Sequence, residues 1–443
     1  MINGCDRDRR RPKEVTPAAA VILPEQSFEL QIEWRKEVHL MGIKGFTRLL
    51  LLGSVLTAST AWSAEIHGRS STQLLWFNNY FTDQRQVELG EYLRLSVTNL
   101  DKAGKASLFG YGRMTQDLNN GEGFNSRLYY LYGEYRGLFD KLDIRLGRQF
   151  VNLSAGTAII DGGQVDLNNA GPVGLTVFGG RNVIFSLDEE NGHGGDLALG
   201  VSAYLNGFKS TDLEVSWFRK WDDWNIARDT LGASFKQYLF NNLRVYGNTR
   251  YDVISETFSE VLAGAKYYPT SNLILTGEWY QSYPVFDATS IYSVFAVDRY
   301  QEAVFRADYT ITDQIAVHGG YTRQWFEGGA NGNIYQAGLS VRPVEPLQLN
   351  FEYDNNQGYN GKTHGFIADA YYDVTKNLQL SGGIAYDTYQ RDVMSDDEIA
   401  RLYWGGCKYR LAKNMSASLR VENNVNAAYD NDVQGRFVFD YDF

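Results

Sequence analysis

The chain has 443 residues, of which 42 are Lys or Arg and 53 are Asp or Glu, so its formal net charge is −11 at pH 7. An acidic chain is a poor partner for nucleic acid or for an anionic membrane surface, because like charges repel. The composition therefore disfavours functions that depend on binding either of them.

Two segments precede the body of the chain. Residues 1–40 show no periodic pattern, and we interpret them as an upstream leader outside the native protein. Residues 41–64 have the order of a secretory signal peptide, with two basic residues, an apolar core at 49–56 and a small-residue cleavage site that ends at Ala64. The apolar run is far shorter than the ~20 residues that a membrane-spanning helix needs. We expect cleavage between Ala64 and Glu65.

Cleavage there changes both the charge and the cysteine count. Residues 1–64 contain nine of the 42 basic and seven of the 53 acidic residues, which leaves 33 basic and 46 acidic residues and a net charge of −13. Cys5 is lost with this segment, so Cys407 stands alone and no disulfide framework can form. Without a C-x-x-C-H haem attachment motif or a paired-cysteine zinc pattern, we expect neither a cofactor nor a metal site.

Residues 65–443 repeat a pattern of alternating apolar and polar residues. Clear examples lie at 347–354, 378–387 and 415–422. A period of two is typical of a strand with one apolar and one polar face, and no helical period is convincing. The five prolines of this region all lie in or beside proposed turns, as expected if strand interiors need every backbone N–H for the ladder.

Short polar turns alternate with longer hydrophilic segments between the strands. Ten short turns recur along the chain, and segments rich in Gly, Asn and Asp, such as 220–229 and 281–298, lie midway between them. Short turns on one side and long loops on the other are typical of outer-membrane barrels. Ten turns with both chain ends in the periplasm predict 22 strands, and we expect 20 to 22 because 150–181 is hard to divide. We therefore predict an all-β fold, a single closed antiparallel transmembrane β-barrel over residues 65–443.

A soluble sandwich or propeller is the alternative architecture. It would bury one sheet face in a core, whereas the polar face here carries Arg, Glu, Asp and Gln on nearly every strand, which suits a water-filled lumen. Aromatic residues also gather at strand ends, as expected for girdles at two membrane interfaces. On the long-loop side these are Trp217, Trp279, Trp325 and Trp404.

The chain ends in GRFVFDYDF, in which Phe437, Phe439, Tyr441 and Phe443 occupy every second position. This ending resembles that of Gram-negative outer-membrane β-barrel proteins, whose last strand carries alternating aromatic residues and a C-terminal Phe. The resemblance implies an outer-membrane location, with membrane lipid around the barrel. It also implies that these four residues form the signal that the barrel-assembly machinery reads.

Alternation places a set of charged side chains on the inward face, where they are expected to line a pore. Because both signs are mixed, these residues fit cross-strand ion pairs as well as a selectivity element, and we expect no sharp ion selectivity. The set comprises Arg94, Glu134, Arg145, Glu214, Arg244, Arg250, Glu278, Glu302, Arg306, Asp308, Arg342, Glu352, Asp369, Asp387, Arg420 and Glu422.

Barrel size bears on the function. Barrels of about 16–18 strands leave an aqueous channel, and 22-stranded transporters fill theirs with a plug. Here the first strand is expected directly after the cleavage site, which leaves no room for a plug domain. We expect a porin-like channel for passive passage of small hydrophilic solutes or ions. Segment 281–298 is our candidate for an inward-folded loop that narrows the lumen.

Two alternative functions remain open. In size, in the missing plug and in its aromatic-rich strands, the chain is similar to the barrel subunits of porin–cytochrome conduits, which implies a sheath around a multihaem cytochrome. A substrate-specific transport channel is the second alternative, since residues 144–149 (IRLGRQ) are similar to strands of some specific porins.

An enzyme is not expected. A barrel protease or lipase needs a nucleophile with a histidine and an acid, and no G-x-S-x-G or comparable signature occurs. The acidic segment 392–398 does not follow the ligand spacing of an EF-hand. Cys407 alternates with lipid-facing positions, so we interpret it as a small residue on that face. The histidines of the mature chain, interpreted as solvated, are His67, His193, His318 and His364.

Overall fold

The computed structural model describes residues 64–79, 84–120, 124–185, 193–290, 298–358, 361–390 and 396–443. The leader at 1–40, the signal segment up to residue 63 and most of the acidic segment 392–398 lie outside the described residues. The domain boundaries and the cleavage site therefore stay predictions. In the described part of the chain, no helix is long and apolar enough to cross a membrane.

All regular secondary structure of the described residues is β-strand, in 22 strands. Their bounds are β1 (Glu65–Asn79), β2 (Gln84–Thr98), β3 (Ala106–Asp117), β4 (Asn125–Leu138), β5 (Leu142–Leu153), β6 (Gly156–Ala170), β7 (Val173–Ile184), β8 (His193–Phe208), β9 (Thr211–Asp222), β10 (Asn225–Leu239), β11 (Leu243–Asp252), β12 (Thr257–Thr270), β13 (Leu273–Ser282), β14 (Tyr300–Thr312), β15 (Ile315–Phe326), β16 (Asn331–Val344), β17 (Leu347–Gly358), β18 (Gly361–Asp373), β19 (Leu378–Tyr389), β20 (Glu398–Ala412), β21 (Met415–Val425) and β22 (Asp432–Asp442).

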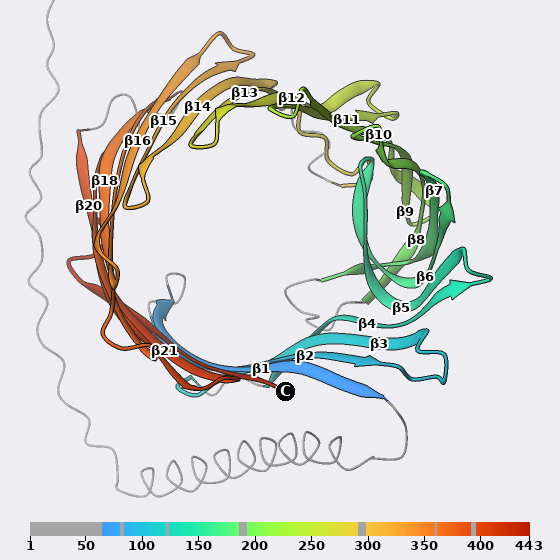
Figure 1. Cartoon of the computed structure of the whole chain (residues 1–443), viewed down its shortest axis with the longest axis horizontal. Helices are drawn as coiled ribbons and strands as arrows, with labels where there is room; N and C mark the ends of the chain where they lie inside the picture. The colour runs from blue at the N-terminus through green and yellow to red at the C-terminus, as the bar shows by residue number, and fades with distance from the viewer. Residues whose placement is uncertain are drawn as a thin grey trace, which may run out of the picture. The chain divides into compact units, whose positions relative to one another are not determined.

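The strands form one closed sheet. Each strand pairs antiparallel with its neighbours in sequence, and β1 also pairs with β22, which turns the sheet into a barrel (Figure 1). The prediction of a single closed antiparallel barrel is confirmed, with the strand count at the upper end of the expected range. The stretch 150–181 contains the end of β5, all of β6 and most of β7.

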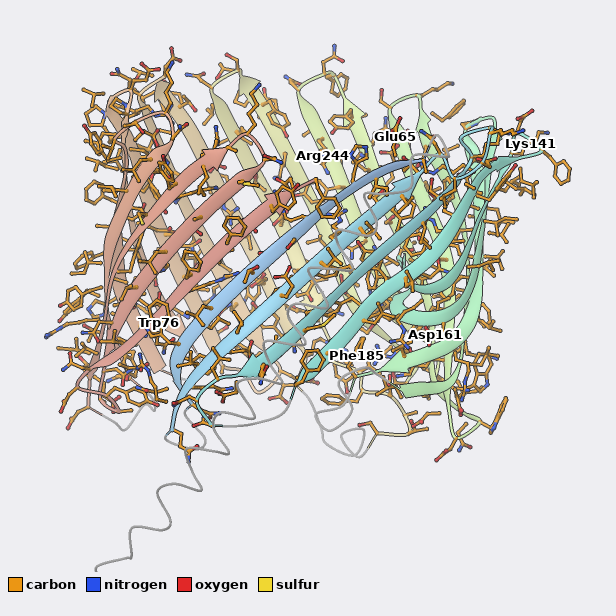
Figure 2. The ribbon with its side chains drawn as sticks, turned by 90° about the horizontal axis from the view of Figure 1, so that it is seen from below. Glu65, Trp76, Lys141, Asp161, Phe185 and Arg244 are labelled. Carbon is orange, nitrogen blue, oxygen red and sulfur yellow. The ribbon has the colours of Figure 1, made fainter. Side chains whose placement is uncertain are left out.

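The two ends of the barrel differ. Ten short turns gather at the end that holds Glu65 and the C-terminus, which we call the turn end, and Figure 2 shows Glu65 and Lys141 together there. We call the opposite end the loop end. The prediction of a long loop at 220–229 is wrong. Strand β9 ends at Asp222 and β10 begins at Asn225, so only residues 223–224 separate them.

Register assigns each side chain to one face of the wall, because residues directly opposite each other in an antiparallel pair point the same way. The apolar alternate residues, such as Leu146, Phe305 and Phe351, are 49–64% exposed on the outer face. Trp404 departs from the expected girdle. It pairs with Glu422 on the inner face, where the Arg420 guanidinium carbon lies 4.4 Å from its ring centroid.

The last residue belongs to the seam that closes the barrel. The Phe443 amide donates to the Gly68 carbonyl over 3.0 Å, and the Gly68 amide donates back over 2.9 Å. The Phe443 ring covers Gly68, where a Cβ would lie within 2.7 Å of a ring atom. Beside them, Arg69 donates to both Asp442 carboxylate oxygens, over 2.6 and 3.0 Å. The strand is therefore anchored to its last residue, while its role as an assembly signal stays a prediction.

Deleting Phe443 should lower the fraction of folded barrel in the membrane while export continues, because the seam loses two backbone hydrogen bonds and the ring over Gly68. The heat-dependent band shift of membrane fractions on gels measures this fraction. Phe443→Tyr keeps the ring and both hydrogen bonds, and is the matched control. An unchanged folded fraction after the deletion would show that the terminal residue is dispensable.

Candidate functional site

Part of the β5–β6 hairpin leaves the wall and folds into the lumen (Figure 1). Strand β5 pairs with β4 only as far as Arg148, and β6 pairs with β7 only as far as Ile160. Residues 149–159 pair with each other and with no other strand. Gly147 lies at the bend with a φ of +127°, a conformation that only glycine adopts readily, and a Cβ there would collide with the Leu131 carbonyl oxygen.

The folded-in hairpin, residues 149–160, packs an apolar face against the inner wall. This packing also identifies the inner face of the sheet, because the wall residues in the cluster belong to the same face as the predicted charged set. Burying a side chain of this size contributes about 1.5–3 kcal/mol. The buried cluster comprises Val151, Leu153, Ala155 and Ile160 of the hairpin and Phe178, Ala198 and Phe218 of the wall.

Polar contacts hold the tip of the hairpin at the wall. The Ser154 amide donates to a Glu214 carboxylate oxygen over 2.8 Å, and the Ala155 amide donates to the Ser216 hydroxyl over 2.8 Å. The Thr230 hydroxyl donates to the Ala155 carbonyl over 2.8 Å. Backbone groups at the tip thus have wall partners, which satisfies polar groups that burial would otherwise strip of water.

Gly232 makes this close approach possible. The Ala155 amide nitrogen lies where a Cβ of residue 232 would stand, so any larger side chain would push the tip away. On the next strand, Arg250 Nε donates to the Ser154 carbonyl over 3.4 Å, and Arg250 also forms an ion pair with Glu260 at 3.3 Å. The tip is therefore fitted to a specific place on β9 to β11.

A second segment, residues 283–290, is attached to the inner wall near the loop end. The Asp287 carboxylate accepts from Lys220 over 2.7 Å and from Arg228 over 2.8 Å, and the Ala288 amide donates to the Ala227 carbonyl over 2.7 Å. These residues belong to the expected constriction loop 281–298, of which 291–297 lie outside the described residues. The main inward-folded element of the described chain is the β5–β6 hairpin.

The hairpin and the wall border an open pocket of about 620 Å³ in the lumen. Its lining is mainly polar and charged and comes from strands β5 to β11, with the exposed ring of Phe150 on the hairpin side. We call it the lumen pocket. Its polar lining includes Arg145, Gln164, Tyr204, Glu214, Lys236 and Arg244.

The charges of the lumen pocket are only partly compensated. Arg145 contacts the buried Glu134 carboxylate at 2.8 Å, and Lys236 forms an ion pair with Asp212. Within the described residues Arg244 has no ion pair. Its guanidinium carbon lies 5.2 Å from the Tyr246 ring centroid, a cation–π contact, and the nearest acidic charge of the pocket, Asp212, is already paired with Lys236. The pocket therefore offers a cation for an anionic group of a solute.

The register places the whole predicted charged set on the inner face. Arg145, Glu214 and Arg244 meet at the lumen pocket, and Arg250 lies at the hairpin tip. Other members of the set contact neighbouring residues of the wall. The Tyr246 hydroxyl donates to Glu278, the Tyr300 hydroxyl donates to Glu302, and Arg420 contacts Glu422 at 3.1 Å. The role of the set in conduction stays a prediction.

The two signs are less evenly mixed than the sequence indicates. Glu352, Asp354, Asp369 and Asp387 lie on the inner face of β17 to β19, and these strands carry no inward-facing Lys or Arg. No ion pair involves these four carboxylates in the described part of the chain. We call them the acidic wall.

Sequence reasoning missed the hairpin and its contacts. Residues 150–160 lie in the stretch that is hard to divide into strands, and Ser216, Thr230 and Gly232 are unremarkable small inner-face residues. The available signal was the cluster of glycines at positions 147, 162 and 163, which flank the hairpin on both sides. Strand glycines often mark a bend or a close approach of backbones.

A closed barrel with an apolar outer face and a polar lumen is a β-barrel of the outer-membrane type. No protein-family model matches the sequence, and no curated protein matches it. Among solved structures, a point mutant of the ferric enterobactin receptor PfeA of Pseudomonas aeruginosa is similar, with a TM-score of 0.58 and 11% identity over 86% of this chain and 81% of that chain.

Two further structures resemble the chain. OccK3 (OpdO) of Pseudomonas aeruginosa has a TM-score of 0.44 and 10% identity over 86% of this chain and 96% of that chain. OccAB1 of Acinetobacter baumannii has a TM-score of 0.40 and 11% identity over the same shares. At such identities the likeness concerns the fold.

Acid should release segment 283–290 from the wall. Burial raises the pKa of Asp287, but the hydrogen bond from Lys220 and the nearby Arg228 cation outweigh burial and hold this pKa below its ordinary value of 3.8. Because the pKa is lowered in the folded state, the attachment contributes in full above pH 3.8 and is lost as the pH falls through the folded-state pKa.

Hydrogen exchange of residues 283–290 at neutral pH and in acid, corrected for the intrinsic pH dependence of exchange, measures this release. Asp287→Asn removes the charge and should leave the segment weakly protected at both pH values. Full protection of the Asn variant would contradict the role of the ion pairs.

The position of the hairpin tip is testable by cross-linking. The hydroxyl oxygens of Ser154 and Ser216 lie 2.7 Å apart. Cysteines at both positions, in a Cys407→Ser background, should therefore form a disulfide under mild oxidation, seen as a loss of free thiols. The control pair joins residue 154 to Ser381 on the inner face of β19 and should stay reduced. Equal oxidation of both pairs would contradict a docked tip.

Proposed function

We propose that the protein is an outer-membrane channel for passive passage of small hydrophilic solutes, which pass the lumen pocket on their way. The observation that carries the proposal is the β5–β6 hairpin tied to the inner wall, with a polar pocket of about 620 Å³ beneath it. A hairpin that is docked inside a wide barrel narrows the path that a solute can take through the lumen.

The chemistry of the pocket supports selection of solutes by polarity and charge. Solutes that leave bulk water need hydrogen-bonding partners, which Asn152, Asn206 and Ser234 offer along the lining. Arg244 adds a cation without an ion pair in the described residues. Passage of a charged solute thus costs less here than along an apolar wall.

The outer face and the terminal strand suit an outer-membrane environment. The apolar outer face suits the lipid of the outer membrane of a Gram-negative bacterium, and the terminal strand with Phe437, Phe439, Tyr441 and Phe443 suits recognition by the barrel-assembly machinery. Passive passage needs no catalytic group, so we propose no enzymatic activity.

Purified protein in planar lipid bilayers should show stepwise conductance. Phe178→Ala should raise the conductance per step, because it removes a ring from the cluster that holds the hairpin, a change that costs about 3–5 kcal/mol in a packed core. Phe305→Ala, on the outer face, is the matched control and should leave the step size unchanged.

The same preparation distinguishes the channel from the sheath alternative. Absence of conductance steps would contradict the proposed channel. A silent barrel that co-purifies with a haem-staining protein would instead favour a sheath around a multihaem cytochrome.

A further inference from the structure

Aromatic side chains form a continuous row on the inner face of β2 to β4. The register pairs Phe109 with Tyr132 and Tyr111 with Tyr130, all on the inner face, and Tyr129 is the extra residue of a β-bulge in β4. We call the row the aromatic track. Its members are Tyr92, Phe109, Tyr111, Tyr129, Tyr130, Tyr132 and Phe185.

Successive rings of the aromatic track are in contact. From the turn end toward the loop end, the ring centroids of Phe109 and Tyr132 lie 5.3 Å apart, those of Tyr132 and Tyr130 5.8 Å, and those of Tyr130 and Tyr111 5.8 Å. Tyr111 stacks on Tyr129 at 4.9 Å, with 18° between the ring planes.

One end of the track lies near the loop end of the barrel. Phe185 follows the last residue of β7, and its ring centroid lies 6.3 Å from that of Tyr129. Figure 2 shows Phe185 far from Glu65 and Lys141, which mark the turn end. The track therefore follows the direction in which a solute crosses the barrel.

The docked hairpin does not cover this row. The inward-folded hairpin packs on β7 to β11, and its cluster contains no residue of β2 to β4. Tyr92, Tyr111, Tyr130 and Tyr132 remain half-buried. Aromatic rings that face a water-filled lumen without a covering core are typical of a binding surface.

Basic groups border the aromatic track. Arg94 lies directly opposite Tyr111 on the inner face, is exposed, and has no ion pair within the described residues. At the end of the track nearest the turn end, Arg145 is a diagonal neighbour of Tyr132 across the β4–β5 pair. Arg145 also lines the lumen pocket. Arg145 is paired with Glu134, so Arg94 is the cation of the track without an ion pair in the described residues. The track thus joins the loop end to the pocket.

We propose that the aromatic track binds acidic oligosaccharides and guides them to the lumen pocket, a role that rests on the proposed channel function. The C–H faces of sugar rings pack on aromatic faces, and the hydroxyls of five tyrosines provide hydrogen-bonding partners at the ring edges. A row of rings suits an elongated ligand with repeated flat units. Guanidinium groups bind the carboxylates of such a ligand in bidentate fashion.

Calorimetric titration of the detergent-purified barrel tests the proposal, with tetragalacturonate as the acidic probe and maltotetraose as the neutral probe of equal length. The acidic probe should bind at least tenfold more tightly than the neutral one. Tyr111→Ala and, separately, Tyr130→Ala should each weaken its binding several-fold. Arg94→Gln should reduce the preference for the acidic probe.

Two controls separate binding from folding. Tyr335→Ala removes a ring from the outward-facing Tyr321–Tyr335 pair, whose centroids lie 5.1 Å apart, and should leave binding unchanged. Heat-dependent gel migration shows that each variant is folded. Tyr130→Phe keeps the ring and loses only the hydroxyl, so it should bind more tightly than Tyr130→Ala.

Equal binding of both probes, or unchanged binding in both alanine variants, would overturn the proposal. Conductance steps in the same preparation would then leave the channel function standing. Failure of the track and failure of the channel are therefore separate outcomes.

Discussion

Backbone pairing is the constraint on which the structure depends. In lipid no water is available to an unpaired N–H or C=O, so a sheet can cross the membrane only if it closes on itself. Closure between β1 and β22 fixes the register around the whole ring, and the register in turn decides which side chains meet lipid and which meet the lumen. The bonds between Gly68 and Phe443 extend this pairing to the last residue of the chain.

The inward fold of the β5–β6 hairpin creates a break in the wall, because β4 and β7 lose their pairing partners beyond Arg148 and Ile160. Side chains bridge the break. The Tyr129 and Phe185 rings contact each other across it, and the Arg127 guanidinium carbon lies 4.9 Å from the Phe185 ring centroid. The loop-end part of the aromatic track, Tyr129 and Phe185, thus also helps to keep the wall closed.

The architecture could be predicted because a period of two is a local signal. Each strand shows its apolar face in a few residues, and the aromatic ending of the chain shows where the last strand lies. The hairpin could not be predicted in this way, because its position depends on contacts with residues distant in sequence. The hairpin docks through Glu214, Ser216 and Gly232, whereas Trp404 faces inward by the same alternation that places Cys407 outward.

The lumen has an acidic side and a side on which both signs of charge occur. The acidic wall on β17 to β19 lies across the barrel from the strands that hold the hairpin (Figure 1), while Arg94, Arg145 and Arg244 lie on or beside the aromatic track and the lumen pocket. An acidic wall that faces a side of mixed charge creates a field across the lumen rather than along it. An anionic solute is repelled by the acidic wall and attracted toward the track, so its path runs along one side of the barrel, beside the hairpin.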